Sequence, residues 1–210
     1  MKKKEEIKLI ELNTKRMEVT IVGDSDLVLN KMDDITAEQL VGERIGEAKR
    51  LEKPNEWEKI ITSMHWYNGK PTDFSEEGLK KALKDNSPCI SAFGLKRSFC
   101  DAVVRNEIDK YKTKFDANIN ILSVGGLVPI KFAQHVIDEK LMSPQRGKPV
   151  LSRTNRFIGW SATFTVSYMD NVYSAEQILN IINLAGFGLG IGGGRPSGFG
   201  RYHVESVKGE

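Results

Sequence analysis

The feature that most constrains this chain is a glycine-dense segment near its C-terminal end. Eight glycines fall between Gly186 and Gly200, Arg195 lies among them, Arg201 follows them, and no acidic residue interrupts the run. Glycine at this density gives up side-chain packing and costs backbone entropy when it becomes ordered. A chain keeps it where the backbone turns sharply or lies against another molecule, and a loop rich in amides and arginine suits a phosphate backbone.

The flanking sequence places this loop between a helix and a strand. Ser174 and Gln177 form a capping-box pattern, apolar residues follow at helical spacing to Ala185, and Gly186 is expected to end the helix. Residues 200–207 favour a short strand. The loop matches the pattern G-x-G-x-x-G, but a dinucleotide-binding loop needs a strand before it and a helix after it. The reversed order argues against a nucleotide cofactor, and no cofactor is predicted.

Length and composition indicate one soluble domain. The chain has 210 residues, no apolar run of about 18 residues and a basic start that is too short and too charged for a signal peptide. Cys89 and Cys100 are expected to be reduced thiols of a cytoplasmic protein. No membrane association is expected.

Charge is distributed unevenly although the net charge is only +3. No Asp or Glu occurs from Lys140 to Met169 or from Gln177 to Val204, which favours a basic face. Residues 138–156 are predicted to form a long mobile basic loop. Its candidate binding residues are Arg146, Lys148, Arg153 and Arg156, and Lys96 and Arg97 are secondary candidates elsewhere in the chain.

The order of predicted elements indicates an α+β fold. We expect a strand at 16–22, a helix opened by Thr36, a short helix around Trp57, a short strand at 64–67, helices from Ser75 and Ser91, strands at 118–124, 127–130 and 157–168, a helix at 174–185 and the closing strand. Reduced to its core this is the β-α-β-β-α-β arrangement, a ferredoxin-like (RRM-like) antiparallel sheet with helices on one face. We therefore predict a single domain over 1–210, with inserted loops at about 23–74 and 131–156.

Several segments together resemble a group of uncharacterised phage and prophage proteins. They are Leu27–Met32, Gly69–Pro71, Gly126–Ile130, Arg156–Thr163 and Ala185–Arg201. The element order with its glycine loop also resembles the RAMP superfamily of CRISPR-associated proteins, which bind or process RNA. In that superfamily the glycine loop contacts the RNA backbone, and backbone subunits assemble along RNA with a mobile thumb insertion. The resemblance implies RNA contacts at 188–201 and a thumb at 138–156.

We therefore predict a non-catalytic protein that binds single-stranded nucleic acid, RNA favoured, and that oligomerises along its ligand. Tyr202 and Phe199 either stack on bases or pack in the core. The predicted nucleic-acid-binding residues are Gly188, Gly190, Gly192, Gly193, Gly194, Arg195, Gly198, Gly200, Arg201, Tyr202, Arg146, Lys148, Arg153 and Arg156.

Two alternatives remain open. One is a metal-independent endoribonuclease with a histidine as general base, for which His203 is the first choice and His65 the second, since no spacing typical of metal ligands occurs. The other is an interaction protein that mimics or caps a CRISPR backbone subunit of a host defence complex. In that case the loop arginines pair with acidic residues of a neighbouring subunit.

Overall fold

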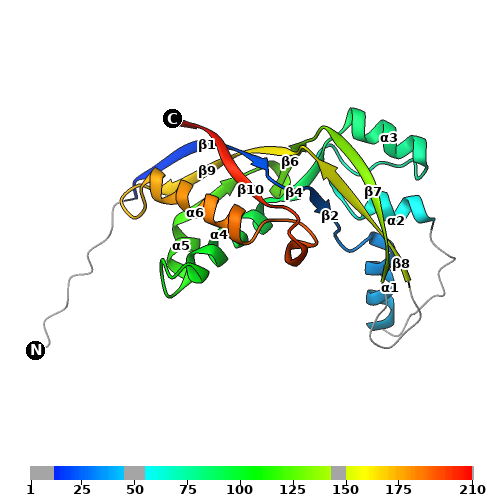
Figure 1. The fold of residues 1–210 in the computed structure, drawn as a ribbon, viewed down its shortest axis with the longest axis horizontal. Helices are drawn as coiled ribbons and strands as arrows, with labels where there is room; N and C mark the ends of the chain where they lie inside the picture. The colour runs from blue at the N-terminus through cyan, green and yellow to red at the C-terminus, as the bar shows by residue number, and fades with distance from the viewer. Residues whose placement is uncertain (1–11, 45–54, 143–149, 210) are drawn as a thin grey trace, which may run out of the picture.

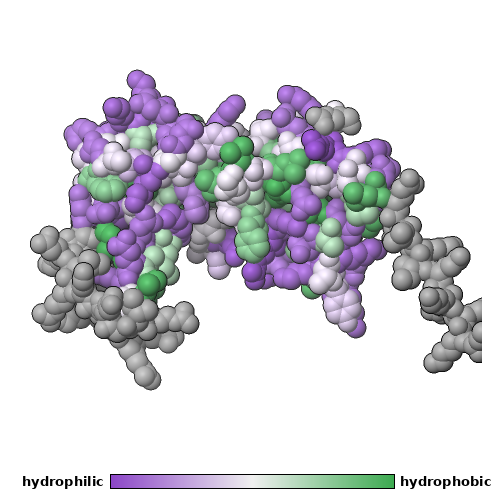
Figure 2. Space-filling model, turned by 180° about the vertical axis from the view of Figure 1, so that it is seen from behind, coloured by the Kyte–Doolittle hydropathy of each residue, from purple (hydrophilic) through white to green (hydrophobic). Residues whose placement is uncertain are grey.

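The computed structural model describes residues 12–44, 55–142 and 150–209. Two parts of the molecule lie side by side (Figure 1). One is a sheet that contains the first and last described strands and is covered by helices, and the other is a smaller sheet with helices beside it. From behind, the surface is mainly hydrophilic, and hydrophobic residues reach it in small patches, several of them near the middle of the molecule (Figure 2). None of the described helices is long and apolar enough to cross a membrane.

The central sheet is antiparallel throughout its described strands. Its order is β10 (Tyr202–Gly209), β1 (Thr14–Gly23), β9 (Ser161–Met169), β6 (Leu127–Lys131), β4 (Pro88–Ser91) and β3 (His65–Trp66), with β5 (Ile119–Leu122) also paired to β9. β5 and β6 pair with successive parts of β9, because a 3-10 turn at Val124–Gly126 interrupts them. Together they form the second strand of the predicted core.

Two interleaved β-α-β units make up that core. β1, α4 (Ala92–Arg105) and β5 form one unit, and β9, α6 (Ala175–Gly188) and β10 form the other. Both helices cover the same face of the sheet, together with α5 (Lys112–Asn118) (Figure 1). The α+β, ferredoxin-like fold class is confirmed.

The core lies between this sheet and these helices. Alternate residues of β9 are buried, as the period of two in the sequence predicts. They face the apolar stripes of α4 and α6, which include Leu95, Phe99, Ile178 and Ile182. Ser91 caps α4 through the Gly94 amide, and Ser174 with Gln177 forms the predicted capping box of α6.

The second part contains a three-stranded sheet in the order β2 (Leu27–Leu29), β8 (Val150–Ile158) and β7 (Gln134–Met142). Three helices lie beside it, α1 (Asp34–Arg44), α2 (Glu56–Thr62) and α3 (Glu76–Asp85) (Figure 1). The prediction of a loop at 138–156 was wrong where the structure describes it, because 134–142 and 150–158 pair as a hairpin. The proline and glycine that suggested a loop fall between the two strands.

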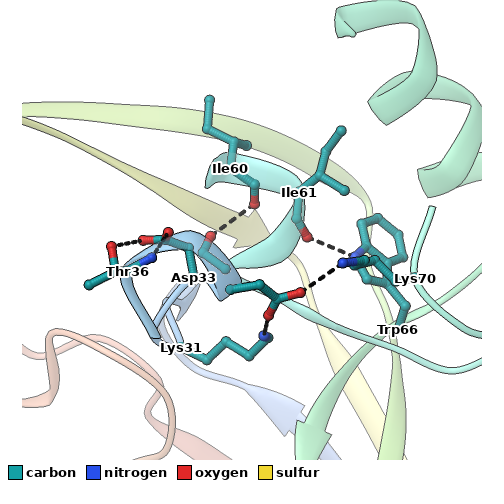
Figure 3. A network of polar contacts seen from close by, with 9 residues as sticks. Lys31, Asp33, Thr36, Ile60, Ile61, Trp66 and Lys70 are labelled. Carbon is teal, nitrogen blue, oxygen red and sulfur yellow. Dashed lines mark hydrogen bonds and ion pairs between the residues drawn. The ribbon is translucent and has the colours of Figure 1, made fainter. Parts of the chain in front are cut away.

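Smaller corrections concern element boundaries. Thr36 does not cap α1; Asp33 does, and its carboxylate accepts hydrogen bonds from the Thr36 amide and hydroxyl at 2.9 and 2.8 Å (Figure 3). Gly186 does not end α6, which continues to Gly188; Gly186 is buried, and an added Cβ would collide with Tyr202. Gly159 breaks the predicted strand 157–168 into β8 and β9. β4 and α5 were not predicted.

Candidate nucleic-acid interface

The glycine loop, residues 189–201, is fixed onto the turn that follows β1. The Gly200 amide donates to the Asp26 carbonyl oxygen at 2.8 Å. The Ser25 hydroxyl donates to the Gly198 carbonyl oxygen at 2.8 Å and accepts from the Arg201 amide at 2.9 Å. The Gly193 amide donates to the Val28 carbonyl oxygen at 2.8 Å. Hydrogen bonds within the chain, from its backbone and from the Ser25 side chain, therefore order this loop.

Glycine is required here because backbone segments of the loop approach one another closely. Gly200 has a φ of +70°, and an added Cβ would collide with the Ile191 carbonyl oxygen. At Gly190 (φ +68°) an added Cβ would lie 2.7 Å from the Gly200 carbonyl oxygen, and at Gly192 it would lie 2.5 Å from that of Val28. The close approach that the sequence suggested exists, but at these positions the approaching backbone belongs to the protein.

The same folding uses most of the amides of the loop. The amides of Gly190, Ile191, Gly193, Ser197, Gly198 and Gly200 donate to backbone carbonyl oxygens. In the part of the chain that the structure describes, the amides of Gly192, Gly194 and Arg195 have no such acceptor, and all three residues are exposed. An anion could reach the loop at these three positions.

A cleft of about 320 Å³ lies between the glycine loop, the segment after β2 and the start of α4. This volume is at the lower end of the range typical of small-ligand pockets. Apolar residues of the lining include Leu29, Ile90, Leu95 and Ile191. Polar and charged residues include Asn30, Lys31, His65, Ser91, Arg97, Ser98, Asp101 and Arg195.

The cleft carries positive charge that no acidic residue of the described ranges neutralises. Arg97 and Arg195 form no ion pair within the described ranges. Among the lining residues that the structure describes, Asp101 is the only one with a carboxylate, and it lies 3.3 Å from the Lys112 ammonium. Ser91 and Gly94 at the start of α4 also line the cleft, where the helix dipole favours an anion. The cleft is therefore suited to an anionic group.

Lys31 reaches the cleft from a small ion network. Its ammonium lies 2.8 Å from Asp34, and the Lys70 ammonium lies 2.9 Å from the same carboxylate. Figure 3 shows both lysine side chains converging there. Hydrogen bonds from Lys31 and Lys70 lower the pKa of Asp34. Nearby, the Trp66 indole donates to the Ile61 carbonyl oxygen and fixes the end of α2 against β3.

Of the three histidines, His65 lines the cleft and the other two do not. Burial lowers the pKa of His65, and the charge of Lys31 lowers it further, so its imidazole is neutral at pH 7. The His203 ring lies 2.6 Å from Asp24 on the exposed side of β10. His135 is held by the buried Asn155 at 2.9 Å.

The predicted binding arginines of the hairpin are engaged elsewhere. Arg153 pairs with Glu56 and, at 2.6 Å, with Glu139. The Arg156 guanidinium lies 2.7 Å from Asp26. These acids neutralise the two arginines locally, while Arg146 and Lys148 lie outside the described residues.

Tyr202 and Phe199, which were expected either to stack on bases or to pack in the core, both contact other side chains of the protein. Tyr202 is 1% exposed and packs edge-on against Trp160, with ring centroids 6.2 Å apart. The Phe199 ring lies beneath Lys140 and Arg156, at 5.0 and 5.5 Å. The expectation for Tyr202 is therefore corrected, because a buried ring cannot reach a base; its burial follows from the inward face of β10.

Along the described strand β9, the face of the central sheet opposite the helices carries no Phe, Tyr or Trp. Along β9 it presents Ser161, Thr163, Thr165 and Ser167, where single-strand binders with an RRM fold carry stacking aromatics. The exposed phenylalanines lie on the helices instead, Phe93 at 70% and Phe187 at 85%. Sequence reasoning missed both, because each interrupts a helical pattern without any local signal of exposure.

No protein-family model and no curated protein matches the chain. Among solved structures it is similar to a chain in the cryo-EM structure of the Type III-B Cmr-beta bound to cognate target RNA. That match has 9% identity and a TM-score of 0.52, and it covers 93% of this chain and 60% of the other. The chain thus spans about 60% of the length of that neighbour.

A second solved structure is Cmr6 from Pyrococcus furiosus. It shares 11% identity with a TM-score of 0.34, over 93% of this chain and 100% of that one. The first similarity establishes the fold and, since one fold hosts many functions, assigns no activity by itself. The chain has the α+β, ferredoxin-like fold that its element order predicts.

Proposed function

We propose that this protein binds single-stranded nucleic acid, RNA favoured, in the cleft between the glycine loop and α4. The observation that carries the proposal is the convergence of Arg97 and Arg195 in a cleft of about 320 Å³ without an acidic partner for either among the described residues. Support from the fold comes from the similarity to a chain in the structure of Type III-B Cmr-beta, since Cmr-beta is bound to cognate target RNA in that structure.

Each part of the cleft has a role in this proposal. The guanidinium groups bind phosphate oxygens, to which arginine presents a planar fork of donors. The amides of Gly192, Gly194 and Arg195 add donors on the loop side. Such contacts carry little sequence information, so binding is expected to depend weakly on base identity. The binding site predicted from the sequence is thereby narrowed to Arg195 and its neighbours, with Arg97 added.

The test is a binding titration of a fluorescent single-stranded RNA of about 12 nucleotides. Arg97→Ala and Arg195→Ala are each expected to weaken binding roughly tenfold, as for a lost charged hydrogen bond that is partly exposed. Lys80→Ala is the matched control, because Lys80 lies on α3, away from the cleft, with 70% of its side chain exposed. Unchanged affinity in both arginine variants would remove the cleft as the binding site.

A second candidate function is metal-independent RNA cleavage, favoured by the position of His65. A neutral imidazole in the cleft can accept the proton of an attacking 2′-hydroxyl, and Lys31 and Arg195 line the same cleft as possible stabilisers of negative charge. Labelled RNA incubated in EDTA distinguishes the functions. Cleavage that His65→Ala abolishes and His203→Ala retains supports the enzyme; binding without cleavage supports the binder alone.

A further inference from the structure

We infer that Phe93 and Phe187 are stacking platforms for the bases of a strand held in the cleft. The inference rests on the proposed function and deepens it, since it assigns the base contacts that the cleft lacks. Phe93 is 70% exposed and Phe187 is 85% exposed. Both residues are in helices, so the backbone that carries each ring is ordered before a ligand binds.

Both rings lie where α4 begins and α6 ends. The Ser98 hydroxyl, in the second turn of α4, donates to the Gly190 carbonyl oxygen at 3.2 Å, just beyond the end of α6. The two helices also pack against each other on the sheet. Phe93 and Phe187 therefore border the same end of the helical layer, which is the end that the cleft occupies.

Each of these two phenylalanines has an arginine near it in the fold. Phe93 precedes Arg97 by four residues in α4, a spacing that places two side chains on one helix face, and Arg97 lines the cleft. The Phe187 carbonyl oxygen accepts a hydrogen bond from the Arg201 guanidinium at 3.1 Å. In a single strand a phosphate and a base alternate. An arginine near an exposed phenylalanine suits this repeat, because the arginine can bind the phosphate and the ring can stack on the base.

A single exposed phenylalanine needs no explanation, because apolar atoms make up much of any protein surface. Two of them lie at the end of the helical layer that the cleft occupies, near arginines that form no ion pair among the described residues. Single-strand binding uses this combination. Tyr111 provides the contrast. It is 62% exposed and immediately precedes α5, so it lies away from the start of α4 and the end of α6, where Phe93 and Phe187 are found.

The experiment compares two oligomers of about 12 nucleotides, oligo(A) and a ribose-phosphate chain of the same length without bases. Phe93→Ala and Phe187→Ala are each expected to weaken oligo(A) binding about 5- to 150-fold, the range of stacking losses per base. On the abasic chain each variant should bind within about twofold of wild type, because no base is present to stack. Phe187→Tyr should retain the affinity, and Tyr111→Ala should match wild type on both oligomers.

The outcomes separate the two proposals. Wild type that binds neither oligomer removes the proposed function itself. Binding that Arg195→Ala weakens and both phenylalanine variants leave unchanged retains the proposed function and overturns stacking. Equal losses on oligo(A) and on the abasic chain also overturn stacking. A phenylalanine variant that loses self-association in light-scattering chromatography, while its affinity for oligo(A) is unchanged, would show that the rings contact protein instead.

Discussion

Substitution of three glycines with different surroundings tests what the glycine loop needs. Alanine at Gly200 would be held at a φ of +70°, which costs about 1–2 kcal/mol for a residue with a Cβ. Its Cβ would also push against the Ile191 carbonyl oxygen. That collision strains two hydrogen bonds. One runs from the Ile191 amide to the Gly200 carbonyl oxygen at 3.0 Å, and the other from the Gly200 amide to the Asp26 carbonyl oxygen at 2.8 Å. Each is worth about 1 kcal/mol.

The free energy of unfolding should therefore fall by about 3–4 kcal/mol in Gly200→Ala, a decrease in Tm of about 6–16 °C for a chain of this size. In Gly198→Ala only the strain applies, because its φ is +86° and an added Cβ meets nothing within 4 Å; the loss should be about 1–2 kcal/mol. In Gly188→Ala neither applies, and the last residue of α6 should gain up to about 1 kcal/mol.

Thermal and urea unfolding followed by circular dichroism measure all three variants. The expected order of stability is Gly188→Ala, wild type, Gly198→Ala, Gly200→Ala. Equal stability of the three variants, with RNA binding lost in Gly200→Ala alone, would refute the reasoning. It would mean that the glycines serve a ligand and not the packing of the loop.

Three further predictions concern the cap, the histidines and the cysteines. Ser174→Ala should lower the free energy of unfolding by about 1 kcal/mol through loss of the capping box, and an unchanged urea midpoint would contradict this. Burial lowers the pKa of His65 and His135, so the unfolded chain takes up these protons first, and stability should fall as the pH drops below about 6.5. His65→Gln should flatten that decline in urea titrations, and an unaltered slope would count against it. Burial raises the pKa of Cys89 and Cys100 to about 11, so a thiol reagent should label neither in the native state and both after unfolding; rapid native labelling would be inconsistent with the fold.

Local signals predicted the elements that depend on neighbouring residues. The alternation along β9, the capping box of α6 and the order of a helix, the glycine loop and a strand all follow from short stretches of sequence. The strands at 134–142 and 150–158 were not predicted, because polar residues make these segments resemble a loop. What makes them strands is their pairing with each other. The burial of Tyr202 was not predicted for a related reason, since the pairing of β10 with β1 decides which side chains of β10 face the core.

The cleft could be predicted only in part. Arg195 was expected from its place among the glycines, and Arg97 was only a reserve candidate. Lys31 and His65 join them because β2, β3 and α4 meet at the glycine loop. No spacing of residues in the sequence predicts that these segments lie together. Most of the ion pairing was equally hidden from the sequence, since Glu56 lies 97 residues from Arg153 and Asp26 lies 130 residues from Arg156.

The central claim, that the cleft binds the phosphates of a single strand, is tested most directly by the salt dependence of RNA affinity. Titrations over a range of salt concentrations should give a logarithm of Kd that rises linearly with the logarithm of the salt concentration. The slope should fall by about 1.4 when Arg97 and Arg195 are both replaced by alanine, about 0.7 for each phosphate that the variant no longer neutralises. No binding at low salt, or the same slope in the double variant as in wild type, would contradict the account.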